Sequence, residues 1–291
     1  MSQPTLIPLP DRGLLAVTGP DRLEFLQGLL SNDVARAADG RAVWAALLTP
    51  QGKYLHDVFV LPFDGALALD CEAGRRDDLK HRLEGYRLRS DVDILDVTEF
   101  YDSLSLLGDG AAQAVRLADE PGAVADYGGG LAWRDPRHPG LGVRLTLPRE
   151  AGHPAGFAHG DPADWDRARL ALGIPDGSRD LVPERSILLE NGFDELRGVS
   201  WDKGCYVGQE LTARTKYRGL VRKRLLPVRI DGEPPPPGTP VLAGESEAGE
   251  LRSGRDGLAL ALLRLDALET GAPLTAGTAR VTPMRPDWMR A

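Results

Sequence analysis

Cysteine is nearly absent from this chain, because Cys71 and Cys205 are the only two among 291 residues. Two lone cysteines exclude a disulfide framework and do not have the spacing of a zinc site. Long apolar runs are absent as well: the two longest, 42–48 and 258–263, are far shorter than the roughly 20 residues that span a bilayer. No apolar run follows a basic start, so no signal peptide is expected. We therefore expect a soluble, cytoplasmic protein with no membrane association.

Several motifs of common enzyme classes are also missing. No glycine-rich phosphate loop follows a strand pattern and no Gly-x-Ser-x-Gly elbow occurs, which argues against a nucleotide hydrolase and an α/β-hydrolase. The histidines show no ligand spacing, so no permanent metal is expected. They are His56, His81, His138, His153 and His159. The 42% apolar and 27% charged residues are ordinary for a globular chain with a sizeable core.

The formal net charge of −8 disfavours direct nucleic-acid binding. The charge is unevenly distributed, because residues 203–224 carry +6 and the remaining chain carries −14. One interpretation of this basic segment is a site for a small polyanion or an acidic partner surface. The other is a solvated basic face or a strand edge guarded by charge. The sequence leaves both open.

Strands and helices are interleaved along the first part of the chain, which is typical of an α+β fold. Period-2 patterns predict strands at 14–18, 42–48, 54–61, 66–71, 92–97 and 103–107. Helical spacing of apolar residues predicts helices at 20–30, 75–88, 111–117 and 164–172. The stretch between the last two helices is expected to be loop-rich, because 128–130 and 153–156 are rich in glycine and proline.

The pattern changes near residue 221 to short strands divided by turns, at 225–230, 241–243, 249–253 and 258–265. We expect a small β-barrel or sandwich over 221–291. Residues 1–220 are expected to form the body, as two interleaved α+β modules of which the second covers roughly 45–155.

The segment Lys203–Glu210, of sequence KGCYVGQE, is the most distinctive in the chain. Lys203 lies two residues before Cys205, and a helical pattern starts just after it, at Glu210–Arg214. A nearby cation and the N–H groups of a helix start both favour thiolate over thiol. The functional interpretation is a reactive or ligating cysteine; the alternative is a buried structural one. Cys71 ends an alternating stretch and is expected to be a strand residue; the alternative is a redox partner of Cys205.

This octapeptide resembles the signature of the YgfZ family, the folate-binding relatives of the glycine-cleavage T protein, which include mitochondrial homologues that help iron–sulfur proteins mature. Further segments fit the same family: 18–34, 47–53, Asp57-Val58, 198–200, 249–253 and 259–264. The resemblance implies a body of ferredoxin-like units and a C-terminal barrel, with the modules around a central channel that holds tetrahydrofolate or a derivative. The T protein keeps a related lysine–aromatic–glycine segment without the cysteine.

The family treats the cysteine as its hallmark, so Cys205 is the expected working group, with Lys203 and Arg214 stabilising its anion. The rest of the signature loop is Gly204, Tyr206, Gly208, Gln209 and Glu210. The glycines let the backbone approach a ligand closely. Tyr206 is also a plausible core residue, and Glu210 and Arg214 have the spacing of a helical ion pair.

Folate requires an apolar slot, a carboxylate for the pterin edge and a base for its tail. The candidates by residue type are Trp44, Tyr54 and Trp201 for the slot, Asp57, Asp180 and Glu190 for the carboxylate, and Arg224 or Lys223 for the tail. Asp57 is carried over from the T protein, whose matching segment has two adjacent acids. The first acid position is His56 in this chain, which puts aminomethyl transfer in doubt.

The first functional hypothesis is a folate-binding protein that supports assembly or repair of iron–sulfur enzymes. Its partners would include the radical enzyme that methylthiolates tRNA, so its link to tRNA would be indirect. The alternative is a folate-dependent aminomethyltransferase or methyltransferase of the T-protein type, and a third is a non-catalytic scaffold. The sequence does not decide whether the chain turns over a substrate.

Overall fold

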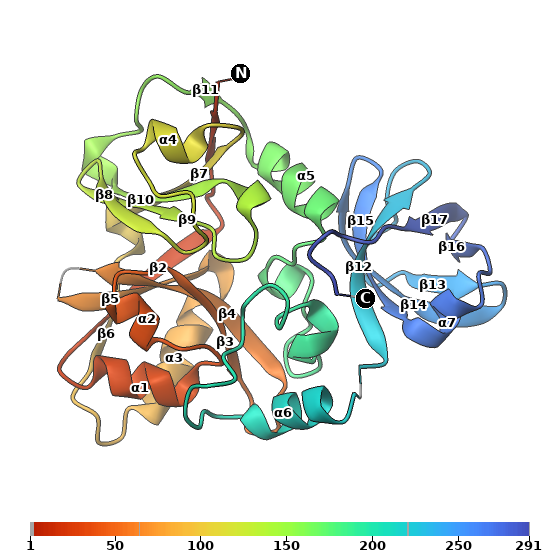
Figure 1. Cartoon of the computed structure of the whole chain (residues 1–291), viewed down its shortest axis with the longest axis horizontal. Helices are drawn as coiled ribbons and strands as arrows, with labels where there is room; N and C mark the ends of the chain where they lie inside the picture. Colours follow the sequence, from red (N-terminus) through yellow and green to blue (C-terminus); the bar gives the residue numbers. More distant parts are fainter. Residues whose placement is uncertain (1–2, 64, 220, 291) are drawn as a thin grey trace. The chain divides into compact units, whose positions relative to one another are not determined.

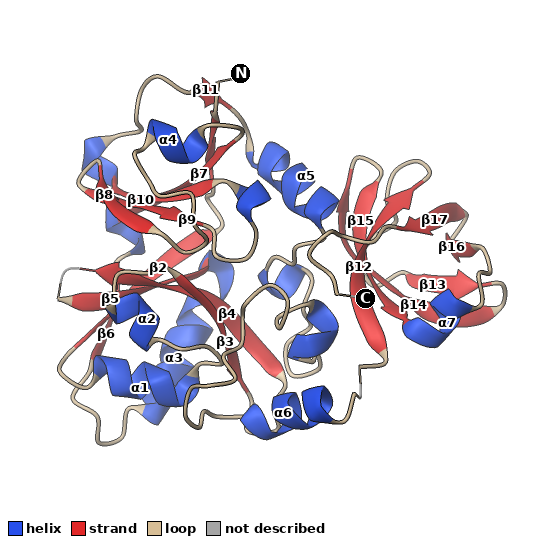
Figure 2. Cartoon of the chain, in the orientation of Figure 1, coloured by secondary structure: helices blue, strands red, loops and turns tan. Residues whose placement is uncertain are grey.

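The strands of the protein form a five-stranded sheet, a six-stranded sheet and a closed barrel (Figures 1 and 2). The computed structural model describes residues 3–63, 65–219 and 221–290. By internal packing the chain divides into two units. The first unit contains residues 1–48, 56–165 and 197–207, and the second contains 49–55, 166–196 and 208–291. The α+β prediction and the C-terminal barrel prediction are both confirmed.

The five-stranded sheet has the order β3-β4-β5-β2-β6. Its strands are β2 (Arg12–Thr18), β3 (Val43–Leu48), β4 (Tyr54–Phe63), β5 (Ala66–Glu72) and β6 (Asp93–Asp96). The helices α1 (Arg22–Leu29) and α3 (Arg76–Tyr86) pack against it, and the short α2 (Ala35–Ala38) follows α1 (Figure 1). Leu79 and Leu83 are buried one turn apart on α3, as the helical pattern predicts. Cys71 is a buried residue of β5, as expected.

The six-stranded sheet has the order β11-β1-β7-β10-β9-β8. Its strands are β1 (Thr5–Pro8), β7 (Tyr101–Leu107), β8 (Val124–Tyr127), β9 (Gly130–Arg134), β10 (Val143–Pro148) and β11 (Ala158–His159). The helix α4 (Ala111–Ala114) packs on one face, where Ala112, Leu104 and Leu145 share an apolar cluster.

The two sheets of the first unit face each other through a layer of aromatic and charged side chains. The rings of Phe59 on β4 and Trp133 on β9 are 5.0 Å apart. The guanidinium of the buried Arg144 lies 5.2 Å from the Phe59 ring and 4.9 Å from that of Trp165. Burial lowers the pKa of Arg144 to about 10, although the neighbouring Asp135 opposes this shift. The cation–π contacts and the Asp135 carboxylate thus offset the cost of removing the Arg144 charge from water.

The prediction of a loop-rich stretch after residue 117 was wrong for β8, β9 and β10. Gly128 and Gly129 have φ angles of 59° and 78°, so they form the tight turn between β8 and β9. Arg134 is the last residue of β9, and Arg144 alternates with the apolar residues of β10; both arginines are buried and ion-paired. This alternation is the pattern of a strand, but the glycine- and proline-rich segments 128–130 and 153–156 favoured a loop.

The barrel has the order β12-β15-β14-β13-β16-β17. Its strands are β12 (Lys223–Ile230), β13 (Pro240–Ala243), β14 (Ser246–Arg255), β15 (Leu258–Arg264), β16 (Leu274–Ala276) and β17 (Ala279–Pro283), with α7 (Leu265–Glu269) after β15. Val228, Val241 and Leu251 belong to its core. The remaining helices are α5 (Pro162–Leu172) and α6 (Gln209–Tyr217). Within the described residues, no helix has the length and apolar character needed to cross a membrane.

Candidate functional site

Lys203 fixes the signature loop, residues 203–210, to the end of helix α1. The Lys203 ammonium donates to the carbonyl oxygens of Gln27 at 2.7 Å, Leu30 at 2.6 Å and Asn32 at 2.9 Å. The last carbonyls of a helix have no partner inside the helix, so a cation there satisfies them and interacts favourably with the helix dipole. Burial lowers the pKa of Lys203 to about 8, and the nearby Asp33 carboxylate partly opposes this shift.

Backbone and side-chain bonds reinforce the same attachment. Ser31 donates its hydroxyl to the carbonyl of Gly198 at 2.6 Å, and Asn32 donates its amide to that of Arg197 at 2.7 Å. Val207 donates its N–H to the carbonyl of Gly28 at 3.1 Å. The structure thus brings together 28–32 and 197–207, two segments more than 160 residues apart in sequence. The anchoring roles of Ser31 and Asn32 were not predicted; their only sequence signal is a polar pair that follows an apolar helix.

Cys205 is exposed on this loop, whereas Cys71 is buried. Burial raises the pKa of Cys71 to about 12, which makes that thiol inert near neutral pH. Gly204 beside Cys205 is also exposed. Tyr206 is buried, and the Lys203 ammonium lies 5.2 Å from its ring centroid. The loop therefore holds an accessible thiol between two residues that are tied to the protein.

The second half of the signature begins helix α6. Gly208 has a φ of 79° and caps the helix, which then starts at Gln209. A Cβ on Gly52 would lie 2.7 Å from the Gly208 carbonyl oxygen, so the turn at 49–53 approaches this cap closely. Glu210 and Arg214 form an exposed ion pair at 3.7 Å. This contact matches the ion-pair alternative for the two residues, and an exposed pair of this kind adds little stability.

Trp44 and Asp57, two candidates for folate contacts, lie together in the first unit. The indole of the fully buried Trp44 donates to the Asp57 carboxylate at 2.9 Å. The adjacent His56 is buried and bonds Asp78 at 2.8 Å. Burial and then the Arg75 charge lower the pKa of His56 to about 4, so its imidazole is neutral near pH 7. Trp201, two residues before the signature loop, is half-buried.

Asp180 lies in the second unit and is fully buried. One of its carboxylate oxygens accepts from Arg169 at 2.7 Å and from the Asp176 N–H at 2.8 Å. The other accepts from the hydroxyl and the N–H of Ser253 at 2.5 and 3.1 Å. The interpretation of Asp180 as a pterin-binding carboxylate is therefore not supported, because protein donors occupy its acceptor positions.

The other candidates of the second unit differ in how accessible they are. Tyr54 is fully buried at the start of β4. Glu190 is half-buried, and burial raises the pKa of its carboxyl against the opposing charges of Lys223 and Lys53. Arg224 donates to the Leu189 carbonyl at 2.8 Å and pairs with Glu195, a partner not identified from sequence. The charge of Lys223 thus acts on the half-buried Glu190 carboxyl, whereas Arg224 is already held by the protein.

Comparison with known families and structures agrees with this architecture. Residues 10–122 match the GCVT N-terminal domain, and residues 222–291 match the CAF17 C-terminal beta-barrel domain. The chain superposes on the glycine cleavage system aminomethyltransferase T of Bartonella henselae with a TM-score of 0.78, over 99% of this chain and 87% of that one. Only 16% of residues are identical, so this likeness concerns the fold.

The family assignment is based on sequence similarity to curated relatives, including the following three. The iron–sulfur cluster assembly factor IBA57 of Homo sapiens is 35% identical, over 96% of this chain and 84% of its own length. The protein of Mus musculus is 34% identical, over 98% and 85%. The Neurospora crassa homologue is 34% identical over 76% of this chain, which spans only 53% of that longer relative.

These relatives correct one expectation. Each is named as a mitochondrial protein, which contradicts the predicted cytoplasmic location. The chain belongs to the family of IBA57 iron–sulfur cluster assembly factors, built on the GcvT-like fold with a C-terminal barrel.

Proposed function

We propose that this protein supports the assembly or repair of iron–sulfur proteins and that the thiolate of Cys205 is its working group. One observation carries the proposal: Cys205 is exposed on a loop that Lys203 binds to three carbonyl groups at the end of α1. An accessible thiol on a fixed loop has the properties of a ligand or a sulfur acceptor. The other cysteine, Cys71, is excluded from this role by its burial in β5.

In this role the iron–sulfur cluster is cargo, not a resident cofactor. Iron–sulfur clusters take four protein ligands, usually thiolates. Cys205 supplies one of them, so the other ligands come from the partner that delivers or receives the cluster. Lys203 fixes the loop that carries Cys205, since its ammonium contacts three carbonyl oxygens. Arg214 pairs with Glu210 on α6.

Tetrahydrofolate or a derivative is the cofactor that the GcvT-like fold implies. The half-buried Glu190 fits it, because a carboxyl with a raised pKa can either accept from or donate to a pterin edge. Lys223 is the candidate base for the folate tail, because Arg224 is already paired with Glu195. Asp57 accepts a hydrogen bond from the indole of the fully buried Trp44, so this pair stabilises the first unit. Folate would supply one-carbon chemistry when bound, and Glu190 and Lys223 of the second unit would bind and orient it.

The finer assignment is to the YgfZ branch, on the basis of the KGCYVGQE signature. Under it, the client proteins include the radical enzyme that methylthiolates tRNA. The protein then affects tRNA through its client and needs no tRNA surface of its own, in agreement with its net charge of −8.

A rescue experiment tests this proposal. In cells lacking the gene, methylthio-modified tRNA and the activity of a second iron–sulfur enzyme are measured after expression of the wild type, Cys205→Ala or Cys71→Ala. We expect the wild type and Cys71→Ala to restore both quantities and Cys205→Ala to restore neither at equal protein level. Equal rescue by Cys205→Ala would remove the thiol from the mechanism. Methylene-folate formation from an amine donor by that variant would then favour an aminomethyltransferase.

A further inference from the structure

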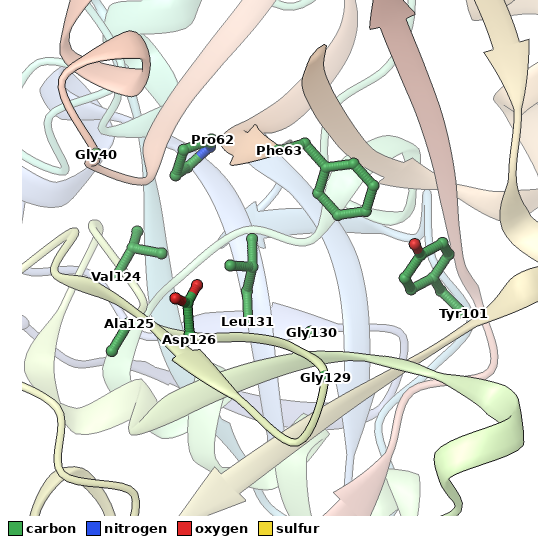
Figure 3. A pocket seen from close by; sticks show the side chains of 10 residues that line it. All are labelled: Gly40, Pro62, Phe63, Tyr101, Val124, Ala125, Asp126, Gly129, Gly130 and Leu131. Carbon is green, nitrogen blue, oxygen red and sulfur yellow. The ribbon is translucent and has the colours of Figure 1, made fainter. Parts of the chain in front are cut away.

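A pocket of about 650 Å³ opens in the first unit at one edge of its two facing sheets. Its walls are the end of β4, the start of β7 and the β8–β9 hairpin (Figure 3). Val124, Asp126 and Leu131 point into the space from one side, and Pro62 and Phe63 approach it from the other (Figure 3). Elsewhere between these sheets Phe59 and Trp133 fill the gap. None of the proposed folate or thiol residues lines this pocket.

Strand β8 is the last strand of the six-stranded sheet, so one of its edges is not paired with another strand of that sheet. The two-residue turn Gly128-Gly129 makes Tyr127 and Gly130 the closing pair of the hairpin. In an antiparallel ladder, hydrogen-bonded pairs alternate with non-hydrogen-bonded ones. Ala125 therefore bonds inward to β9 like Tyr127, and the N–H and C=O groups of Val124 and Asp126 point outward.

The chain covers only the beginning of this edge. Arg41 forms an isolated antiparallel bridge with Ala123, and the N–H of Ala42 donates to the Gly122 carbonyl at 2.8 Å. The chain then leaves β8 to form β3 in the other sheet. Among the residues that the structure describes, no hydrogen bond reaches the outward groups of Val124 or Asp126. The pocket lies directly beside these groups.

The other strand end at this pocket is a poor template for pairing. Strand β4 has 10 residues and β3 has 6, so the end of β4 extends past its neighbour. That end contains Pro62, which has no N–H to donate and blocks pairing there. An added strand would therefore pair with β8, whose groups are complete, and would meet β4 only through side chains.

The chemistry of the pocket specifies one residue of such a strand. Asp126 is exposed at the rim and has no cationic partner among the described residues. Phe63 and Tyr101, whose ring centroids are 5.3 Å apart in an edge-to-face pair, line the end of the pocket away from β8 (Figure 3). A strand residue occupies about 160 Å³ (roughly 3.3 by 4.8 by 10 Å), so the pocket has room for about four residues.

We propose that β8 accepts an extended segment of a partner protein as an additional strand, with an arginine or lysine of that segment paired with the Asp126 carboxylate. Backbone hydrogen bonds to Val124 and Asp126 supply affinity, and the pocket supplies specificity. Self-pairing of two β8 strands is disfavoured, because it places two Asp126 carboxylates in one interface.

The test uses the full chain and the fluorescent peptide acetyl-Thr-Val-Thr-Arg-Val-Thr-Val-amide. We expect saturable binding by anisotropy, with new hydrogen-exchange protection of the Val124 and Asp126 amides. Replacing the peptide's arginine with glutamate should weaken binding at least about tenfold. Asp126→Lys should do the same, and Val124→Pro should weaken binding by removing one outward N–H while leaving the ladder to β9 intact. Asp231→Lys, an exposed acid in the barrel unit, is the matched charge control.

Three outcomes would overturn the proposal. Equal binding of the arginine and glutamate peptides, or unchanged binding to Asp126→Lys, would show that the pocket does not select a cation. Arginine amide binding as tightly as the peptide would make this a small-cation site. A concentration-dependent dimer that Val124→Pro abolishes would identify a second copy of the chain as the occupant. Because none of these readouts involves Cys205, their failure is distinguishable from failure of the proposed function.

Discussion

The Nζ atom of Lys203 lies 2.6 Å from the carbonyl oxygen of Leu30, across 173 residues of sequence. Leu30 caps helix α1, and this bond joins the signature loop to the first helix of the protein. A lysine two residues from a cysteine is usually interpreted as an electrostatic partner of the thiol. In this protein the ammonium has three carbonyl acceptors, so its most direct effect is to hold the loop that carries Cys205.

Lys203→Met should destabilise the protein and loosen the loop. The substitution keeps the length of the side chain but leaves three partly buried carbonyl groups without their donor, at a cost of about 1–3 kcal/mol. Urea unfolding measures the loss of stability, and hydrogen exchange at 197–207 measures the loosening.

Lys80→Met is the control for that experiment. Lys80 pairs with Glu84 one turn away on α3, at 3.1 Å and partly exposed, so its loss should cost at most about 0.5 kcal/mol. If Lys203→Met cost no more than Lys80→Met, the anchoring role of Lys203 would be refuted.

The two cysteines should differ sharply in reactivity. Cys205 is exposed, whereas Cys71 is buried with its pKa raised to about 12. Iodoacetamide at neutral pH should therefore alkylate Cys205 and leave Cys71 unmodified until urea unfolds the protein. Peptide mass spectrometry gives the extent at each site, with Cys205→Ala as the control. Equal modification of both thiols in the native protein would contradict this difference in burial.

The sequence predicted the elements whose physical cause is local. The apolar run 43–48 became the buried strand β3, and the apolar residues at helical spacing became α1 and α3. The change of pattern near residue 221 correctly predicted the barrel, because short strands divided by turns can be identified from the sequence alone. The family signature identified the loop, and the exposure of Cys205 agrees with the functional interpretation.

Long-range polar contacts account for what the sequence did not predict. Strand β10 has the alternating pattern of a strand and was nevertheless missed. The burial of its Arg144 was not predictable, because only the facing aromatic rings make that arginine a core residue. Asp180 was a folate candidate because a lone aspartate resembles a ligand. Its partners Arg169 and Ser253 are 11 and 73 residues away, and no local pattern identifies them.

Substitution of Asp180 should lower the stability of the protein, whereas substitution of Glu190 should weaken folate binding. Asp180→Ala leaves the fully buried Arg169 without one of its carboxylate partners, and such a loss costs about 3–5 kcal/mol. Glu190→Gln keeps the size of a half-buried side chain and should change stability by less than about 1 kcal/mol. Titration with tetrahydrofolate, followed by tryptophan fluorescence, should show weaker binding to Glu190→Gln. Unchanged folate affinity in this variant would remove Glu190 from the proposed cofactor site.

His56 should make the protein less stable in mild acid. Burial, followed by the Arg75 charge, lowers its pKa from 6.5 to about 4 in the folded state. Between these values the unfolded chain binds a proton at His56 that the folded protein does not, so stability falls as pH decreases from 6.5 toward 4. This difference corresponds to roughly 3 kcal/mol at most. His56→Gln is neutral at every pH and should abolish this part of the pH dependence, whereas His81→Gln, at an exposed position of α3, should leave it intact. Urea unfolding from about pH 4.5 to 7.5 measures the three slopes, and identical slopes for the wild type and His56→Gln would show that His56 is not the titrating group.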